Sequence, residues 1–243
     1  MNDGLMMAAH QPNFIPYLGI FDKMRLVGED GVFIIRDDCQ YVERDWHNRQ
    51  KIRTNSSEGF SWLHVPVDKV MKPLSEIPIR HDKKINGKED WTKFHQRMIE
   101  QFYGKAPYFG DFWPGLENIY SNPGDNLADL NIQIIRYLAS AFGIEARMVR
   151  ATSLSNDVFG QNASETLANM ALTVGAQTYI SGAGGRNYLD ASAFENKVNL
   201  MFQDYTHPTY PQMQPGFQPY MGAIDALFIV GKLPRSGEVI GVD

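Results

Sequence analysis

A histidine flanked by two amide side chains stands in the segment His10-Gln11-Pro12-Asn13. Histidine titrates near neutral pH and can act as a general acid, a general base or a hydrogen-bond donor to phosphate. Gln11 and Asn13 can each donate and accept hydrogen bonds, and Pro12 stiffens the backbone between them. We therefore predict that His10 is catalytic and that both amides contact substrate. The alternative is a structural turn histidine that bonds only to backbone.

Two adjacent carboxylates occupy the segment Arg36-Asp37-Asp38-Cys39-Gln40, after a second strand-like run. Such carboxylates could bind a metal or ribose hydroxyls, or serve as a base. In an extended backbone neighbouring side chains point to opposite faces, so only one can reach a shared cleft. We predict that Asp38 does so and orients His10 or the acceptor, with Gln40 contacting substrate. A surface turn is the alternative, and the acids argue against a reactive Cys39 thiolate.

An aromatic and cationic cluster follows in the segment Trp46-His47-Asn48-Arg49-Gln50-Lys51. Trp46 could stack on a ring, whereas Arg49 and Lys51 could hold a phosphate or a carboxylate. We predict that these three residues and Asn48 contact substrate. The alternative is a solvated, charged strand with one core tryptophan, since runs of charge usually face water.

A glycine-rich stretch, Ser181-Gly182-Ala183-Gly184-Gly185-Arg186-Asn187-Tyr188, follows another strand-like run. Backbone N–H groups in such a loop can face an anion, and Arg186 adds a charge. We predict substrate contacts from Ser181, Gly182, Arg186 and Tyr188. The glycine spacing fits neither the P-loop nor the dinucleotide fingerprint, and a flexible turn is the alternative.

A proline- and aromatic-rich segment near the end of the chain contains His207 and Tyr210. We predict a catalytic role for His207 and a substrate contact for Tyr210, with a packing loop as the alternative. The histidines show no regular spacing of metal ligands, so we predict no metal site. The sequence does not identify a cofactor.

The elements around these residues predict an α/β protein. An apolar run at 5–9, a helical face at 18–26 and a β-rich run at 31–35 form a βαβ unit with parallel strands. Further strands are predicted at 61–65, 77–80, 145–151, 178–181 and 200–202, and helices at 91–102, 112–120, 127–142 (capped by Asp125 or Asn126), 162–174 and 223–230.

This order of elements predicts a three-layer, Rossmann-like, mostly parallel sheet with a helical, aromatic-rich insertion at about residues 86–143. We predict a single domain over residues 1–243. Ligands bind beyond the carboxyl ends of the strands in such sheets. His10, Asp38 and the start of the glycine-rich stretch at Ser181 should therefore be neighbours.

Composition narrows the classes of function. The 243 residues carry a formal net charge of -5 without a strongly basic run, which disfavours bulk nucleic-acid binding but allows a pocket for one phosphate. The single cysteine, Cys39, excludes an intrachain disulfide and fits a reducing compartment. Residues 1–9 lack the apolar core of a signal peptide, and no apolar run approaches the roughly 20 residues of a membrane span. We expect a cytoplasmic protein with no membrane partner.

Short segments spread in order along nearly the whole chain carry a family resemblance. They are HQPNFIPYLG at 10–19, Asp38 with Gln40, Trp46 with Asn48 and Arg49, WLHVPV at 62–67, Ser181-Gly182 with Tyr188-Leu189, and His207-Pro208 with Tyr210 and Gln212. Together these segments resemble the WbqC-like protein family, although the stretch 183–186 is richer in glycine than the family pattern. Members look associated with bacterial gene sets for surface polysaccharides or specialised metabolites. The resemblance therefore implies a role in tailoring a sugar or a small metabolite.

A second resemblance concerns organisation. A histidine turn after the first strand, with a late Ile180-Ser181-Gly182 and Arg186, is similar to the layout of nucleotidylyltransferases. In those enzymes a His-x-Gly-His turn and a late Ser/Thr-Arg motif grip phosphates at a helix N-terminus. Asn13 occupies the place of the second histidine, which removes one phosphate-stabilising cation.

These features together predict a small-molecule transferase of the acyl, aminoacyl or nucleotidylyl type. Its substrate would be anionic or nucleotide-bearing, held by Arg49, Lys51 and Arg186, and its donor would be linked to a nucleotide, a tRNA or a carrier. The main alternative is a non-catalytic, small-molecule-binding accessory protein of a biosynthetic cluster. A hydrolase that activates water is a third class.

Overall fold

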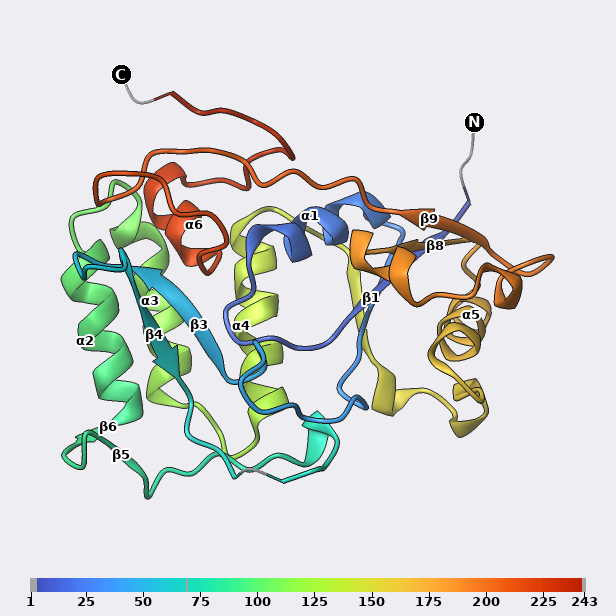
Figure 1. Ribbon diagram of the computed structural model, residues 1–243, viewed down its shortest axis with the longest axis horizontal. Coiled ribbons are helices and arrows are strands. Elements are labelled where there is room, and N and C mark those ends of the chain that lie inside the picture. The colour runs from blue at the N-terminus through green and yellow to red at the C-terminus, as the bar shows by residue number, and fades with distance from the viewer. Residues whose placement is uncertain (1–3, 69, 242–243) are drawn as a thin grey trace.

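A five-stranded parallel sheet forms the centre of the computed structural model, which describes residues 4–68 and 70–241 (Figure 1). In spatial order the strands are β7 (Arg147–Arg150), β2 (Val32–Ile35), β1 (Met6–His10), β8 (Thr178–Ser181) and β9 (Asn199–Phe202). All four neighbouring pairs are parallel, as predicted. The chain builds from β1 toward β7 and then returns to add β8 and β9 on the other side. The strand order therefore reverses between β1 and β8.

Helices cover both faces of the sheet, because neighbouring strand residues face opposite sides. Ala8 and Phe33 pack with helices α1 (Leu18–Val27) and α4 (Leu127–Ala141) on one face. Met7 packs with α5 (Ala163–Thr173) on the other. This arrangement confirms the predicted three-layer, Rossmann-like architecture.

The chain between β2 and β7 adds a lateral region beside the sheet (Figure 1). It holds the antiparallel pairs β3 (Arg49–Arg53) with β4 (Phe60–His64) and β5 (Lys84–Ile85) with β6 (Glu89–Asp90), and helices α2 (Trp91–Tyr103), α3 (Phe109–Ser121) and α4. Helix α6 (Ile224–Val230) returns to pack near α3. Short 3-10 helices are η1 (Leu74–Glu76), η2 (Ala151–Ser153), η3 (Asn156–Val158), η4 (Ala183–Asn187) and η5 (Ala191–Ala193). The region predicted as an insertion is helical, and its last helix also covers the sheet.

Most predicted elements are present, whereas the short β5–β6 pair was not predicted. Asn126, one of the two predicted caps, accepts a hydrogen bond from the Asp129 N–H at 3.1 Å. Residues 77–80 form isolated bridges and no strand, because Pro78 has no N–H for a ladder. Strand β3 was anticipated only as the alternative for the segment that begins at Trp46, since its charges obscure the alternation of buried Gln50 and Ile52.

Candidate functional site

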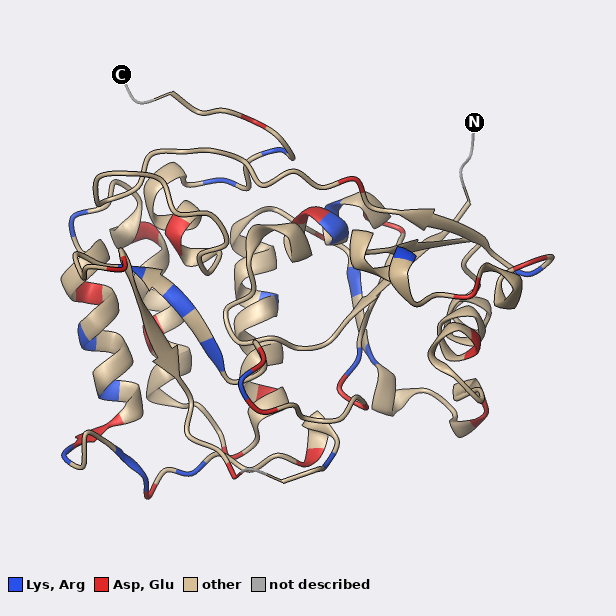
Figure 2. Ribbon diagram, in the orientation of Figure 1, with Lys and Arg blue, Asp and Glu red and all other residues tan. Residues whose placement is uncertain are grey.

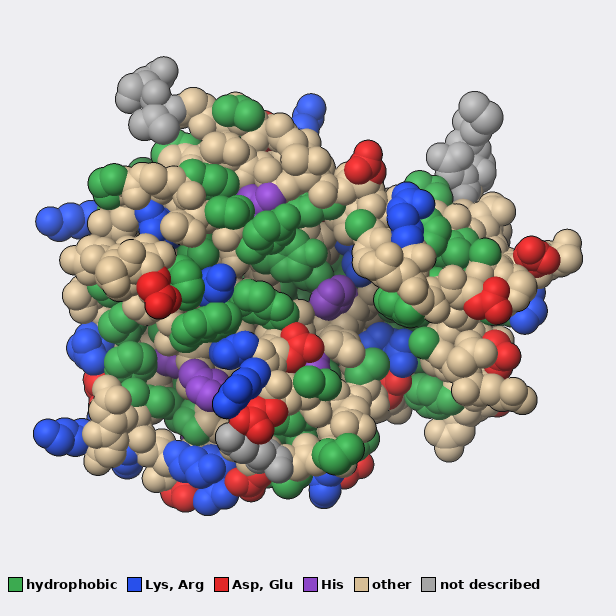
Figure 3. All heavy atoms as spheres, in the orientation of Figure 1, with side chains coloured by type: hydrophobic (Ala, Val, Ile, Leu, Met, Phe, Trp, Pro, Cys, Tyr) green, Lys and Arg blue, Asp and Glu red, His purple; other side chains and the backbone are tan. Residues whose placement is uncertain are grey.

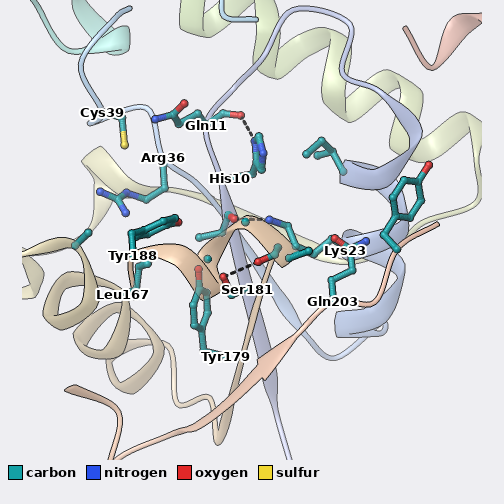
Figure 4. Close-up of a pocket in the computed structure, with 18 of the residues that line it drawn as sticks. His10, Gln11, Lys23, Arg36, Cys39, Leu167, Tyr179, Ser181, Tyr188 and Gln203 are labelled. Carbon is teal, nitrogen blue, oxygen red and sulfur yellow. Dashed lines mark hydrogen bonds between the residues drawn. The ribbon is translucent and has the colours of Figure 1, made fainter. Parts of the chain in front are cut away.

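A cavity of about 660 Å³ lies at the carboxyl ends of β1 and β8, where the strand order reverses. Open parallel sheets bind ligands at this position, and the volume is typical of a small-molecule site. Figure 3 shows a hollow near the middle of the face, beside the segment that follows β8. Its polar and aromatic lining residues are His10, Gln11, Tyr17, Lys23, Arg36, Cys39, Tyr179, Ser181, Tyr188, Gln203, Tyr205 and Tyr220, and several of them are labelled in Figure 4.

His10 is the last residue of β1 and lines this cavity, as predicted (Figure 4). Its Nδ1–H donates a hydrogen bond to the Gln11 carbonyl at 2.9 Å, which leaves a lone pair on Nε2. Burial, together with the nearby Lys23 amine, lowers the pKa of His10 to about 3. The imidazole is therefore neutral at pH 7, and its Nε2 lone pair can accept a proton or a hydrogen bond.

Lys23 is a cavity residue that sequence reasoning missed. It lies on α1, its residue is 3% exposed, and its Nζ donates a hydrogen bond to the Ala9 carbonyl at 2.8 Å. Burial lowers the pKa of the amine to about 7. A signal was available: Lys23 shares a helix face with the apolar residues Ile20 and Val27, where a charged side chain is unexpected.

The second predicted cluster contributes Arg36 rather than Asp38 to the cavity. The Arg36 Nε and Nη2 groups each donate to an Asp38 carboxylate oxygen at 2.8 Å, so Asp38 orients Arg36 and not His10. The alternation used to place Asp38 in the cleft does not hold, because β2 ends at Ile35 and the chain turns, and Asp38 is not among the lining residues. Gln40 is exposed, pairs with Pro73 and does not line the cavity.

The other carboxylate of that pair, Asp37, is fully buried. It accepts hydrogen bonds from the Arg150 Nε at 2.6 Å and from the Thr152 hydroxyl at 2.7 Å. Asp37 thereby ties the end of β2 to the end of β7. Cys39 lines the cavity, and burial raises the pKa of its thiol, which keeps the sulfur protonated.

The glycine-rich stretch forms the cavity wall that follows β8. Ser181, Gly182 and Tyr188, which are predicted substrate contacts, line the cavity. Gly185 permits a close turn, because a Cβ at this position would lie 2.1 Å from the Ser181 Oγ. Arg186 is not a lining residue, since its guanidinium lies over the Phe202 ring at 4.3 Å from the centroid.

The loop between β1 and α1 is fastened to α4 and to the segment before β3. The Asn131 Nδ2 donates to the carbonyls of Pro12 at 2.6 Å and His47 at 2.7 Å. The Gln11 Oε1 accepts from the His47 Nε2 at 2.8 Å. Asn13 is buried and does not line the cavity, so its predicted substrate contact is not supported. These bonds position the loop that carries Gln11.

The third predicted cluster gathers on the β3–β4 hairpin and does not line the cavity. We call Trp46, Phe60 and Trp62 the hairpin aromatic cluster. The Arg49 guanidinium lies 4.3 Å from the Trp62 centroid, and the Lys51 Nζ lies 4.4 Å from that of Phe60. In Figure 3 hydrophobic and basic side chains gather over this hairpin.

Asn48, the remaining predicted contact of that cluster, is buried between the strands. Its Nδ2 donates to the Val65 carbonyl at 2.9 Å, which fixes the start of the hairpin. Arg49 and Lys51 on β3 face aromatic rings on β4, because residues of the two paired strands are cross-strand neighbours. Sequence order alone does not reveal this pairing.

His207 holds a loop and does not line the cavity, so the geometry gives no support to its predicted catalytic role. Its Nδ1–H donates to the Pro208 carbonyl at 2.8 Å, and its Nε2 accepts from the Tyr220 N–H at 3.1 Å. Both ring nitrogens are therefore used by backbone groups. Tyr210 is buried, and burial with the nearby Asp225 carboxylate raises the pKa of its phenol.

Three tyrosines that are not among the predicted substrate contacts line the cavity. The Tyr17 ring lies 5.9 Å from that of Tyr205 and 5.7 Å from that of Tyr220, both in edge-on contact. They come from the start of α1 and from the segments that follow β9. The family segment at 10–19 contains Tyr17, and this was the available signal.

Charged residues of both signs are spread over the whole molecule (Figure 2). Over residues 4–68 and 70–241, no three His, Cys, Asp or Glu side chains are placed to hold a metal ion. None of the helices in the described part of the chain has the length and apolar character to cross a bilayer.

Comparison with known proteins places the chain in a family. The profile of the WbqC-like protein family matches residues 11–235. The chain belongs to the WbqC-like protein family. Another protein, the uncharacterized protein Rv1507c of Mycobacterium tuberculosis, is 35% identical over 228 residues, which cover 93% of this chain and 94% of the relative. No solved structure matches this WbqC-like chain. The resemblance inferred from the short segments is thus confirmed.

Proposed function

We propose that this WbqC-like protein is a small-molecule transferase whose substrate binds in the cavity at the ends of β1 and β8. The observation that carries the proposal is the convergence of His10, Lys23 and Arg36 on one cavity from three separate elements. A neutral imidazole and two nitrogen cations beside a strand-order reversal provide a proton acceptor and charge stabilisation. Such perturbed groups in a cavity are typical of functional sites.

The proposed reaction begins with the acceptor amine or hydroxyl near the His10 Nε2. The acceptor attacks the activated carbonyl or phosphoryl group of the donor and passes its proton to Nε2. The bond to the leaving group then breaks, and the leaving group departs with the bonding electrons and takes the proton from the imidazolium. Lys23 and Arg36 offset the negative charge that develops, and the fixed β1–α1 loop supplies positioning.

The substrate class follows from the cavity and from the family resemblance. The cavity accepts a group the size of a sugar or a small metabolite, and its cations favour an anionic or nucleotide-bearing substrate. The donor would carry an acyl, aminoacyl or nucleotidylyl group on a nucleotide, tRNA or carrier. Donors of this kind occur in the cytoplasm. Arg49, Lys51 and Arg186 are not among the lining residues, so Lys23 takes the anion-holding role in this proposal, while Arg36, which also lines the cavity, is paired with Asp38.

One observation favours a second candidate, a non-catalytic binding protein. With a pKa of about 3, His10 is a weak proton acceptor at pH 7 in the empty cavity. Transfer chemistry requires a bound anion that offsets the Lys23 charge and raises the pKa of His10. A binding protein has no such requirement.

Two measurements test the transferase proposal. Native mass spectrometry of the purified protein identifies a co-purified ligand, and assays with nucleotide-linked, aminoacyl-tRNA and carrier-linked donors then search for product. We expect His10→Ala to lower turnover by about 100-fold or more while the melting temperature stays nearly unchanged. His81→Ala is the matched control, because His81 is exposed and outside the cavity.

Two outcomes would contradict the proposal. A ligand that binds without product from any of the three donor classes would favour the accessory protein. Loss of stability in His10→Ala with unchanged specific activity would show that His10 is a structural turn residue.

A further inference from the structure

Lys23 has a buried amine with little compensation for its positive charge. Its described hydrogen bond goes to the Ala9 carbonyl, and no Asp or Glu in the described part of the chain forms an ion pair with it. The neighbouring Asp22 carboxylate instead bonds to Arg25 and to the Gln203 Nε2. A buried cation without a neighbouring anion lowers the stability of the folded state. Such groups are typical of sites that bind a ligand.

Lys23 differs in this respect from the other cations near the site. Arg36 lines the cavity, but Asp38 neutralises it through two hydrogen bonds. Arg49 and Arg186, outside the cavity, lie over aromatic rings. Of the two basic residues that line the cavity, Arg36 is paired and Lys23 carries the uncompensated charge.

The cavity leaves room beside this amine. A Cβ placed on Gly182 would lie 3.9 Å from the Lys23 Nζ and within 4 Å of no other atom outside its chain neighbours. The next glycine, Gly184, faces open space. In Figure 4 the amine lies between the Ser181 segment and Gln203, on the same side of the sheet end as His10. A compact group can therefore reach Nζ from the glycine-rich wall.

We infer that Lys23 is the anion-binding residue of the cavity and holds a phosphate group of the ligand against the wall formed by Gly182. The inference rests on the proposed function, because it locates the anionic part of the proposed substrate. A phosphate accepts hydrogen bonds from an ammonium group and supplies the missing negative charge. The donor or acceptor then extends from this point past His10.

Anion binding should change the protonation of Lys23. Burial holds the pKa of the free amine at about 7, and a bound anion favours its charged form. Of the other groups around the amine, His10 remains neutral, and burial raises the pKa of the Tyr17 and Tyr205 phenols, which stay protonated. Asp22 faces Arg25 and Gln203. Binding near pH 8 should therefore add a proton to Lys23.

Sulfate is a suitable probe, because it resembles phosphate and does not titrate in this range. The Lys23 Cε resonance, assigned by its loss in Lys23→Met, is followed by NMR of ¹³C-lysine-labelled protein in sodium sulfate and in sodium chloride of equal ionic strength. We expect sulfate to raise the titration midpoint by about one pH unit or more. An equal midpoint in the two salts would overturn the inference.

Matched variants test the same site independently of the titration. We expect Lys23→Met to weaken sulfate binding at pH 7 by about tenfold or more, and Lys51→Met, outside the cavity, to change it less than about twofold. Unchanged binding in Lys23→Met would also overturn the inference. Sulfate binding requires no donor, so absence of turnover leaves the anion site standing, and failure of the anion site leaves the donor assays to decide the transferase.

Discussion

Two buried polar regions of this molecule differ in how many hydrogen-bond partners their charged groups have. One is the part of the cavity lined by His10 and Lys23. The other, which we call the Asp225 network, comprises Arg53, Tyr103, Gln212 and Asp225 between β3, α2 and α6. In the network the Asp225 carboxylate accepts from the Tyr103 hydroxyl and the Gln212 Nε2, each at 2.8 Å.

Arg53 completes the contrast, because its guanidinium is also well partnered. Its Nη2 donates to the carbonyls of Pro215 and Gly216 at 2.8 Å each, which ties the late proline-rich loop to the hairpin. Lys23 in the cavity has one carbonyl partner. Buried polar groups with partners support the fold, whereas buried groups with spare capacity cost stability and can bind a ligand. The Asp225 network therefore supports the fold, whereas Lys23 in the cavity has capacity to bind a ligand.

The largest expected effect comes from breaking the Asp225 network. Asp225→Ala leaves the Tyr103 and Gln212 donors unpaired in the interior, so we expect a loss of about 3 kcal/mol in the free energy of unfolding, measured with urea. Asp225→Asn keeps the size and one acceptor and should lose about 1 kcal/mol. A loss below about 1 kcal/mol in the alanine variant would show that the network contributes little.

The pH dependence of this network has a definite sign. Burial raises the pKa of Asp225 from 3.8 to about 6, so the folded protein holds the proton more tightly than the unfolded chain. The contribution of Asp225 to stability is full below pH 3.8 and is lost as the pH rises through about 6. Asp225→Asn should lack this decrease between pH 4 and 6, approximately the window set by the two pKa values.

An intermediate effect of opposite direction is expected at the cavity. Lys23→Met removes an uncompensated buried amine, so we expect a gain of about 2 kcal/mol in unfolding free energy at pH 7. In the wild type the pKa of Lys23 falls from 10.5 to about 7 on folding, so the unfolded chain binds more protons between these values and stability rises with pH across them.

The methionine variant should lack that rise, as urea midpoints at pH 7 and pH 9, chosen within about that window, would show. A variant less stable than the wild type at pH 7 would place Lys23 with the structural groups and remove the contrast between the regions.

The smallest effect concerns Asn131, whose side-chain N–H groups fix the loop beside the cavity. Asn131→Ala removes two hydrogen bonds to the carbonyls of Pro12 and His47, and we expect a loss of about 1 kcal/mol. Amide hydrogen exchange of Phe14, whose N–H donates to the Trp46 carbonyl, should also become faster. Asn118→Ala, at an exposed position of α3, is the control. Unchanged exchange at Phe14 would show that the loop does not depend on α4.

The sequence predicted the sheet better than it predicted the cavity. Apolar runs and their turns located all five strands of the sheet, and strand ends placed His10 and Ser181 at one edge. Lys23 was missed because a lysine on a helix ordinarily faces water, and only the tertiary structure buries it. Arg36 was missed because the chain turns after β2. Arg36 therefore lines the cavity, and Asp38, which was expected there, accepts hydrogen bonds from Arg36.

The cluster around Trp46 was assigned to the site because cations beside aromatic residues are found in binding surfaces. The same sequence pattern also occurs in a cross-strand ladder. Residues close in sequence gave no information on the aromatic partner of Arg49, Trp62, which lies on β4. The backbone partners of His207, which hold it in its loop, could likewise not be read from the sequence. The catalytic roles themselves remain predictions.

The reversal of strand order between β1 and β8 also affects how the protein is made. During synthesis His10 and Lys23 emerge early, whereas the opposite wall at Ser181 and the tyrosine at Tyr220 emerge last. Closing a cavity from such distant segments requires long-range pairing, which slows folding. A partly synthesised chain cannot form the complete cavity. Ligand binding would therefore select fully folded chains and couple the two ends of the polypeptide thermodynamically.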